Sequence, residues 1–409
     1  MSGASEGFDG AGRKIVVALL IFVVVTNWYP GRLFTFLFDA GVFVLGAAWA
    51  VERAGRGRPI ARSVLLAPLG GIVAWGLAQL AIGSTVYRFE TWVAVLHWSA
   101  LTALFFLSLQ FYGTSSARTG LRRAMLYFGF ALSVVSVVQF FTSDGKVFWL
   151  FPTPYKDFVV GPFLNRDHYA SFIELVLPLA VVEAFLSQRR RVAYAAMAGA
   201  MLATVIAGAS RAGAILVTLE VGVLSLAAVW GGGFGGGRKL GSLARVFALA
   251  GVFTAVVGWE VLWQRFQEPD PYKCRREMAL SAIEMARARP GMGFGLGTFE
   301  SAYPAYQVLD FGLRVDHAHN DWLEWTAEGG IPMLALMAFI ALWSVRGAWR
   351  APWAAGVVAV FLHSFVDYPL QKPAIAAWLF VLLGACAASP QRHRGHREHK
   401  ESNVQEPLS

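Results

Sequence analysis

The chain has 409 residues, of which 56% are hydrophobic and only 15% are charged, and its mean hydropathy is +0.52. A soluble domain carries nearer a quarter charged residues (about 25%), so this composition argues against a soluble globular protein. The net charge of +9 would suggest a nucleic-acid partner in a soluble protein. Here the basic residues sit in short loops between apolar runs, where they set membrane orientation, and no nucleic-acid partner is expected.

The apolar residues come in runs of roughly 16–22 residues, the length needed to cross a hydrocarbon core of about 30 Å. Because backbone polar groups inside lipid must be satisfied within their own segment, these runs should be helices. The sequence therefore predicts an all-α polytopic membrane bundle of about twelve transmembrane helices. The expected spans are 14–29, 33–51, 64–83, 91–112, 124–142, 168–187, 193–209, 212–230, 246–263, 331–346, 353–365 and 374–389.

The loops divide by charge, and every short loop on one side is basic. With a cytoplasmic N-terminus, the inner segments hold 21 of the 35 Lys and Arg residues, which predicts that both termini are cytoplasmic. The chain then divides into nine helices over 1–263, a periplasmic loop over 264–330, three helices over 331–389 and a disordered cytoplasmic tail over 390–409. The glycine run at 231–237 is expected to be a flexible cytoplasmic linker.

The first polar motif in chain order, GPFLNRDHYASFIELVLPLA, covers 161–180. It places Asn165, Arg166, Asp167 and His168 on the outer rim of the sixth span. Glu174 lies within the span, where a carboxylate is costly unless it is paired or faces a polar cavity, so it is a candidate functional residue. The alternative is a structural hydrogen bond from Glu174 to a neighbouring helix.

Arg211 follows in GASRAG, in a very tight turn between the seventh and eighth spans. Small neighbours leave room for a ligand, and a guanidinium is suited to hold a phosphate or diphosphate through two parallel hydrogen bonds. The alternative is an arginine that extends to the membrane interface without binding anything.

The long outer loop at 264–330 contains its own structure. Residues 275–289 have helical apolar spacing and should form an amphipathic helix that Pro290 ends. The sequence GMGFGLGTF at 291–299 fails as a P-loop or dinucleotide motif, because no Lys-Ser/Thr follows it and no strand precedes it. We expect a tight turn that packs the loop onto the membrane body.

The segment DHAHNDWLEWTAEGG at 316–330 carries the richest chemistry. A neutral imidazole such as that of His317 or His319 is the natural general base near neutral pH. A polar helix cap is the alternative, and a metal site would need a third ligand that the spacing does not supply. A last polar segment, HSFVDYPLQKP at 363–373, contains His363, Asp367 and Lys372 and is interpreted as a polar turn.

Under one topology all of these segments fall on the same face of the membrane. In order and spacing the ensemble resembles the O-antigen ligase and polymerase superfamily of bacterial envelope glycosyltransferases. The resemblance rests on GPFLNRDHYASFIELVLPLA, on the Ser210–Arg211 turn, on GMGFGLGTF, and on His319 and Asn320 with Gly330 ten positions beyond. It runs from about residue 160 to the C-terminus.

The resemblance implies a glycan carried on undecaprenyl diphosphate and moved to an acceptor hydroxyl at the periplasmic surface of the inner membrane. It implies transfer with no cofactor, metal or nucleotide sugar. A base opposite the diphosphate leaving group would favour in-line displacement, and hence inversion at the anomeric carbon. The partners implied are the lipid-linked glycan, a glycan or lipid acceptor such as lipid A-core, membrane lipids, and a flippase that delivers the donor.

By position in the family motifs, Arg211 would engage the donor diphosphate and His319 would be the catalytic base. The remaining site residues are expected to bind the donor (Arg166, Arg314, Asn165 and His168) or to support the base (Asn320, Asp316 and Glu174).

Several functions remain open at this point. A ligase and a polymerase share the same chemistry and differ only in the acceptor, and a protein O-glycosyltransferase would be a further variant. A small-solute transporter would need ionisable residues deep within several spans, where this chain offers mainly Glu174, Glu183 and Glu220.

Overall fold

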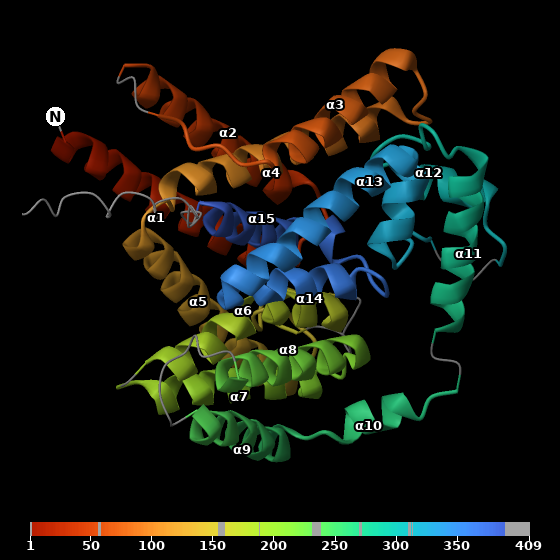
Figure 1. The fold of residues 1–409 in the computed structure, drawn as a ribbon. Helices are drawn as coiled ribbons and strands as arrows, with labels where there is room; N and C mark the ends of the chain where they lie inside the picture. Colours follow the sequence, from red (N-terminus) through yellow and green to blue (C-terminus); the bar gives the residue numbers. More distant parts are fainter. Residues whose placement is uncertain are drawn as a thin grey trace, which may run out of the picture.

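The computed structural model describes residues 2–55, 59–153, 160–187, 189–230, 239–269, 272–309, 312 and 314–388. Within these ranges there are fifteen α-helices and no β-strand, which confirms the predicted all-α class (Figure 1). The glycine run at 231–237 and the tail at 390–409 lie outside the described residues.

Each of the predicted spans overlaps a helix. In chain order the helices are α1 (Ser2–Val25), α2 (Leu33–Ala54), α3 (Leu66–Ile82), α4 (Arg88–Phe111), α5 (Ser115–Thr142), α6 (Arg166–Leu186), α7 (Arg191–Ala207), α8 (Arg211–Trp230), α9 (Lys239–Val257), α10 (Glu260–Phe266), α11 (Lys273–Ala288), α12 (Phe299–Ala302), α13 (Asp321–Arg350), α14 (Ala355–His363) and α15 (Pro373–Ala387). Short 3-10 turns accompany them, η2 (Tyr303–Ala305), η3 (Pro352–Ala354) and η4 (Pro369–Gln371).

Six of the described helices are long and apolar enough to cross a membrane, namely α2, α4, α5, α6, α8 and α13, and the count becomes seven if α9 and α10 are one broken span. Four apolar helices are shorter, namely α3, α7, α15 and the segment Pro352–His363. At a rise of about 1.5 Å per residue they span less than the roughly 30 Å of a hydrocarbon core. The chain is therefore a multi-pass membrane protein, and the count of about twelve spans is not confirmed.

Two predicted spans differ in shape from the expectation. The ninth, 246–263, is not one helix, because the chain bends by 92° between α9 and α10. The bend falls at Gly258, whose φ of +101° is easily adopted only by glycine. The tenth begins at Asp321 rather than 331, and a kink at Gly330 (φ +67°) divides α13 where the outer loop was expected to end.

The glycine-rich turn explains that kink. Gly293, Gly295 and Gly297 all have positive φ, and a Cβ at Gly293 would lie 2.2 Å from the carbonyl oxygen of Glu328. The backbone N–H of Phe294 donates to the carbonyl of Ala327 at 3.0 Å. The expectation that this segment packs the outer loop onto the membrane body is confirmed.

The centre of the bundle is α6, whose side chains are buried almost throughout. It packs against α5, α7, α8, α14 and α15. The segment from α10 to α12 runs along one side of the molecule, at the right in Figure 1, and α11 packs on α13. This arrangement brings the N-termini of α6, α8 and α13 toward the segment that connects α9 to α13.

Candidate functional site

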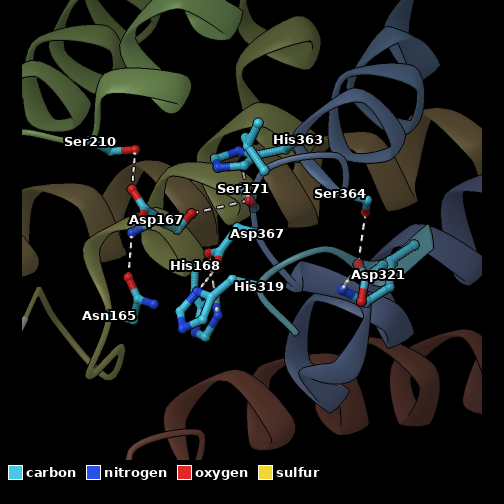
Figure 2. A network of polar contacts seen from close by, with 12 residues as sticks. Asn165, Asp167, His168, Ser171, Ser210, His319, Asp321, His363, Ser364 and Asp367 are labelled. Carbon is cyan, nitrogen blue, oxygen red and sulfur yellow. Dashed lines mark hydrogen bonds and ion pairs between the residues drawn. The ribbon is translucent and has the colours of Figure 1, made fainter. Parts of the chain in front are cut away.

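Asp367 lies at the centre of a polar network between α14 and α15 (Figure 2). Its side chain is fully buried, and its Oδ1 atom lies 2.9 Å from Nδ1 of His319. Nε2 of His168 lies 3.5 Å from Oδ2, and a guanidinium nitrogen of Arg275 lies 4.0 Å from Oδ1. Burial by itself would raise the pKa of Asp367, but His168, His319 and Arg275 lower it below its ordinary value.

The ionised carboxylate decides the state of the imidazole. A carboxylate only accepts hydrogen bonds, so Nδ1 of His319 carries the proton that it donates to Asp367. In neutral imidazole the other nitrogen, Nε2, then holds a free lone pair. The side chain of His319 is 22% exposed, so a ligand at this end of the bundle can reach this nitrogen.

Local structure holds His319 in place. It has a φ of +49°, in the left-handed region that L-residues adopt rarely. The next residue, Asn320, caps α13 by accepting a hydrogen bond from the N–H of Leu323 at 3.0 Å, and its side chain donates to the carbonyl of Phe365 at 2.8 Å. The N–H of Asp321 donates to the carbonyls of both Ser364 and Asp367. The start of α13 is thereby tied to the turn that carries Asp367.

Three imidazoles surround the ring of Tyr368. His317 stacks on it with ring centroids 4.2 Å apart, and His168 and His319 meet it edge-on at 4.7 Å each. Lys372 lies over the same ring, with Nζ 4.8 Å from the centroid. Burial lowers the pKa of Lys372 and raises that of Tyr368, so these two groups favour their neutral forms more than they would in water.

His317 also pairs with a carboxylate through Nδ1, but with a different one from His319. Its Nδ1 atom lies 2.8 Å from a carboxylate oxygen of Glu324, whose other oxygen accepts from the N–H of Ala318. Burial, followed by the charge of Lys372, lowers the pKa of His317 to about 3. Among the described residues no group of three or more His, Cys, Asp or Glu side chains is arranged to hold a metal ion.

Arg211, the first residue of α8, lies in a second polar cluster. Its guanidinium donates to the carbonyl of Arg265 at 2.8 Å and to a carboxylate oxygen of Glu268 at 3.2 Å. It also lies over the ring of Tyr272, 4.8 Å from the centroid. Arg166 lies close enough to interact electrostatically with Arg265, Glu268 and Arg211. These positive groups form an arginine cluster (Arg166, Arg211 and Arg265) where α6, α8 and α10 meet.

Arg275 of α11 connects the two clusters. Its guanidinium donates to Asp167 at 2.6 Å and to the carbonyl of Val366 at 2.7 Å. The other oxygen of Asp167 accepts from the hydroxyl of Ser210 at 2.6 Å, directly beside Arg211. Burial would lower the pKa of Arg275, but Asp367 and Asp167 raise it above its ordinary value. A continuous polar network thus runs from the Ser210–Arg211 turn to His319.

The other predicted site residues have contacts of different kinds. Asn165 caps α6 by accepting from the N–H of Asp167 at 2.8 Å. Asp316 contributes negative charge near Lys372. Glu174 lies inside the bundle, where a carboxylate oxygen is 2.7 Å from Nδ1 of His363 and both side chains are fully buried. That pair matches the structural alternative for Glu174.

Arg314 does not join the network. Its guanidinium forms an ion pair with Glu300, and its side chain is 83% exposed. The two residues line a cavity of about 420 Å³ together with a second ion pair, Arg32 and Glu90. The expectation that Arg314 lies with Arg211 is therefore not supported by these contacts.

Three central residues, Asp167, Asp367 and Arg275, were not among the predicted site residues, although Asp167 was placed on the rim of the sixth span. Asp367 was assigned to a polar turn, and Arg275 to an amphipathic helix in the outer loop. The available signal was the presence of these charged residues on the predicted outer face. Their pairing depends on α11 and the turn after α14 folding against α6, which sequence spacing does not specify.

Residues 175–338 match a family model described as O-antigen ligase. The matched segment includes Arg211, Arg275 and His319. Asp167 and His168 lie just before it, and Asp367 lies well beyond its end. No curated protein matches the chain significantly. The family match confirms the resemblance drawn from the sequence motifs over this segment of the chain.

Proposed function

We propose that this protein transfers a glycan from undecaprenyl diphosphate to an acceptor hydroxyl at the periplasmic face of the inner membrane. The family supports a ligase-like enzyme that uses lipid-linked glycans. The single observation that carries the finer proposal is the pair of His319 and Asp367, 2.9 Å apart and joined through Arg275 to the arginine turn.

In the proposed reaction His319 is the base. Its Nε2 atom removes the proton of the acceptor hydroxyl, and the acceptor oxygen forms a bond to the anomeric carbon of the donor glycan. Asp367 fixes the tautomer and stabilises the imidazolium that results, as a buried carboxylate does in a catalytic triad. General-base catalysis of this kind contributes roughly 10²–10⁴-fold to a rate.

The arginine cluster would receive the leaving group. As the bond between the anomeric carbon and the phosphate oxygen breaks, its electron pair stays on undecaprenyl diphosphate. Arg211 is almost fully buried, and a fixed positive charge stabilises a developing anion best where water is excluded. Glu268 accepts from Arg211 and has a half-exposed side chain, so a diphosphate can replace it as the acceptor.

A base on one side of the sugar and a diphosphate on the other favour in-line displacement, and hence inversion. Arg275 would hold the two halves of the site in register, because its guanidinium contacts Asp167 beside Arg211 and lies near Asp367 beside His319. No step requires a metal ion or a nucleotide sugar.

The test is a transfer assay with the purified full chain in lipid nanodiscs, an undecaprenyl-diphosphate glycan and a lipid A-core acceptor. Ligation gives one discrete shift of the acceptor band on a gel. A ladder formed from donor alone would instead identify a polysaccharide polymerase. Solute exchange across proteoliposomes without any glycan transfer would overturn the proposal in favour of a transporter.

A further inference from the structure

A large cavity lies beside the second half of α13, away from the Asp321 end that adjoins His319. Its volume is about 1,020 Å³, at the upper end of the roughly 300–1,000 Å³ typical of ligand pockets. Its walls come from α8, α13, α14 and α6 and are largely aliphatic and aromatic. No step of the proposed reaction uses this cavity.

The cavity has an opening on the outer surface of the helix bundle, between α8 and α13. Leu219 and Val223 of α8 and Val345 and Trp349 of α13 line it, and each is more than half exposed, with Trp349 reaching 90%. Both helices are candidate membrane spans, so the medium outside this opening is hydrocarbon rather than water. An opening of this kind admits a lipid from the side.

One end of the cavity is cationic. Arg122 and Arg350 line it. Arg122 forms one ion pair, with Glu183 at 3.7 Å. The charges of Arg118 and Arg123 also act on it, so positive groups outnumber the single carboxylate. Arg350 is the last residue of α13, and within the described part of the chain its guanidinium makes no hydrogen bond or ion pair. Arginine pairs readily with phosphate oxygens, and basic pockets between membrane helices bind anionic lipid head groups.

The aromatic residues beside these arginines indicate that this end of the cavity lies at the level of the lipid head groups. Arg122 lies over the ring of Trp353, 5.5 Å from its centroid, and Trp349 precedes Arg350. Tryptophan favours the level of the lipid head groups, where its ring is in an apolar environment and its N–H can meet water. The arginines therefore sit at the depth of lipid phosphates, and the apolar walls extend from there along α8.

Glu220 helps to choose among lipids. It lines the cavity, its side chain is more than nine-tenths buried, and neither carboxyl oxygen has a hydrogen-bond partner in the described structure. A buried polar group without a partner is costly. A polyprenyl chain offers only hydrocarbon to this carboxyl group, whereas a glycerophospholipid brings ester carbonyls that can accept a hydrogen bond from it.

We propose that this cavity binds an anionic glycerophospholipid from the leaflet opposite His319. Its phosphate contacts Arg350 and Arg122, and its acyl chains lie between α8 and α13. The lipid fills a space that would otherwise separate two membrane-spanning helices, and it stabilises their arrangement at the far end of the helix that carries His319.

The experiment uses the purified full chain, stripped of lipid in detergent and mixed with phosphatidylglycerol or with phosphatidylcholine of the same acyl chains. Native mass spectrometry counts retained lipid, and a thermal melt measures stabilisation. We expect retention of one phosphatidylglycerol with at least tenfold preference over phosphatidylcholine, together with a higher melting temperature. Free glycerol phosphate should produce neither effect.

Two variants and one control make the result specific. The double variant Arg122→Gln with Arg350→Gln should lose the preference, and Val223→Trp, which fills the cavity, should lose retention of both lipids. Arg346→Gln removes a charge from the same part of α13 without lining the cavity, and it should behave as wild type. Equal loss in Arg346→Gln, no preference between the lipids, or displacement of phosphatidylglycerol by undecaprenyl diphosphate would overturn the proposal.

Lipid binding is measured without turnover. The same measurements on His319→Ala protein give the result even if the proposed glycan transfer proves wrong. A failure of lipid binding likewise leaves the transfer assay unaffected.

Discussion

The molecule contains a histidine–carboxylate pair in two very different surroundings. In the rim pair, His319 meets Asp367 at 2.9 Å, and in the interior pair, His363 meets Glu174 at 2.7 Å, each through Nδ1. The side chain of His319 is 22% exposed, whereas that of His363 is not exposed at all. His363 also leaves Nε2 without a partner in the described structure.

The difference shows that hydrogen-bond geometry alone does not make an imidazole a catalyst. Both pairs orient the imidazole ring, but Nε2 of His363 is buried, whereas the side chain of His319 is partly exposed. The interior pair is enclosed by α6 and α14, where each charged group depends on the other for its stability. We therefore expect the rim pair to govern turnover and the interior pair to govern folding.

The largest effect should come from the base itself. His319→Ala removes the only proposed proton acceptor, so kcat should fall by about 10²–10⁴-fold in the transfer assay, in line with losses of general-base catalysis. The matched control is His97→Ala, since His97 pairs with Asp39 at 3.0 Å and its side chain is similarly exposed at 19%. Near wild-type turnover in folded His319→Ala protein would remove His319 from the mechanism.

Loss of the leaving-group contact should be nearly as severe. Arg211→Ala should lower kcat by about 10²–10³-fold, the usual result of removing one donor to a developing anion. Arg211→Lys should restore little, because an ammonium group cannot form two parallel hydrogen bonds to a diphosphate. Arg287→Ala, which breaks only an exposed pair with Glu284, is the control. Full activity of Arg211→Lys would show that charge alone suffices.

Asp367 is a positioning residue, and its replacement should change kcat much more than KM. Asp367→Asn keeps the shape but allows the wrong tautomer of His319, so kcat should fall by roughly 10²-fold or more while the KM for acceptor changes little. Asp39→Asn makes the same exchange at the His97 pair and should leave both constants unchanged. A change confined to KM would assign Asp367 to substrate binding instead.

The interior pair should respond in stability rather than in turnover. Glu174→Leu leaves His363 buried without its carboxylate, and breaking a buried ion pair typically costs about 3–5 kcal/mol. The double variant Glu174→Leu with His363→Phe should recover much of the melting temperature, and the surviving folded protein should keep its kcat. A specific loss of kcat in the stable double variant would contradict the division between the two pairs.

The smallest effect concerns His317, which pairs with Glu324 beside the rim pair. Its pKa is about 3 in the folded protein against an ordinary 6.5. Between these values the unfolded chain binds a proton that the folded chain does not, so stability should fall as the pH drops below about 6.5. His317→Gln should flatten this decline in the melting temperature, and identical pH slopes in both proteins would refute the assignment.

The sequence was informative where the signal is local. Apolar run length located a helix at every predicted span, and the glycines of GMGFGLGTF indicated the tight turn observed at Gly293, Gly295 and Gly297. The identities of Arg211 and His319 came from motif order along the chain, and the family match supports that order. Span boundaries were weaker, because the bend at Gly258 and the kink at Gly330 reflect packing rather than hydropathy.

By itself, the sequence determined the helical membrane character of the chain, its resemblance to the O-antigen ligase family and the two residues proposed for chemistry. Only the tertiary structure decided which charges meet: Asp367 with His319, Arg275 with Asp167, and Arg314 with Glu300 away from the network. The physical reason is the distance along the chain over which each kind of signal acts. Hydropathy and turn propensity act over neighbouring residues, whereas a hydrogen bond of about 3 Å between distant segments depends on how whole helices pack.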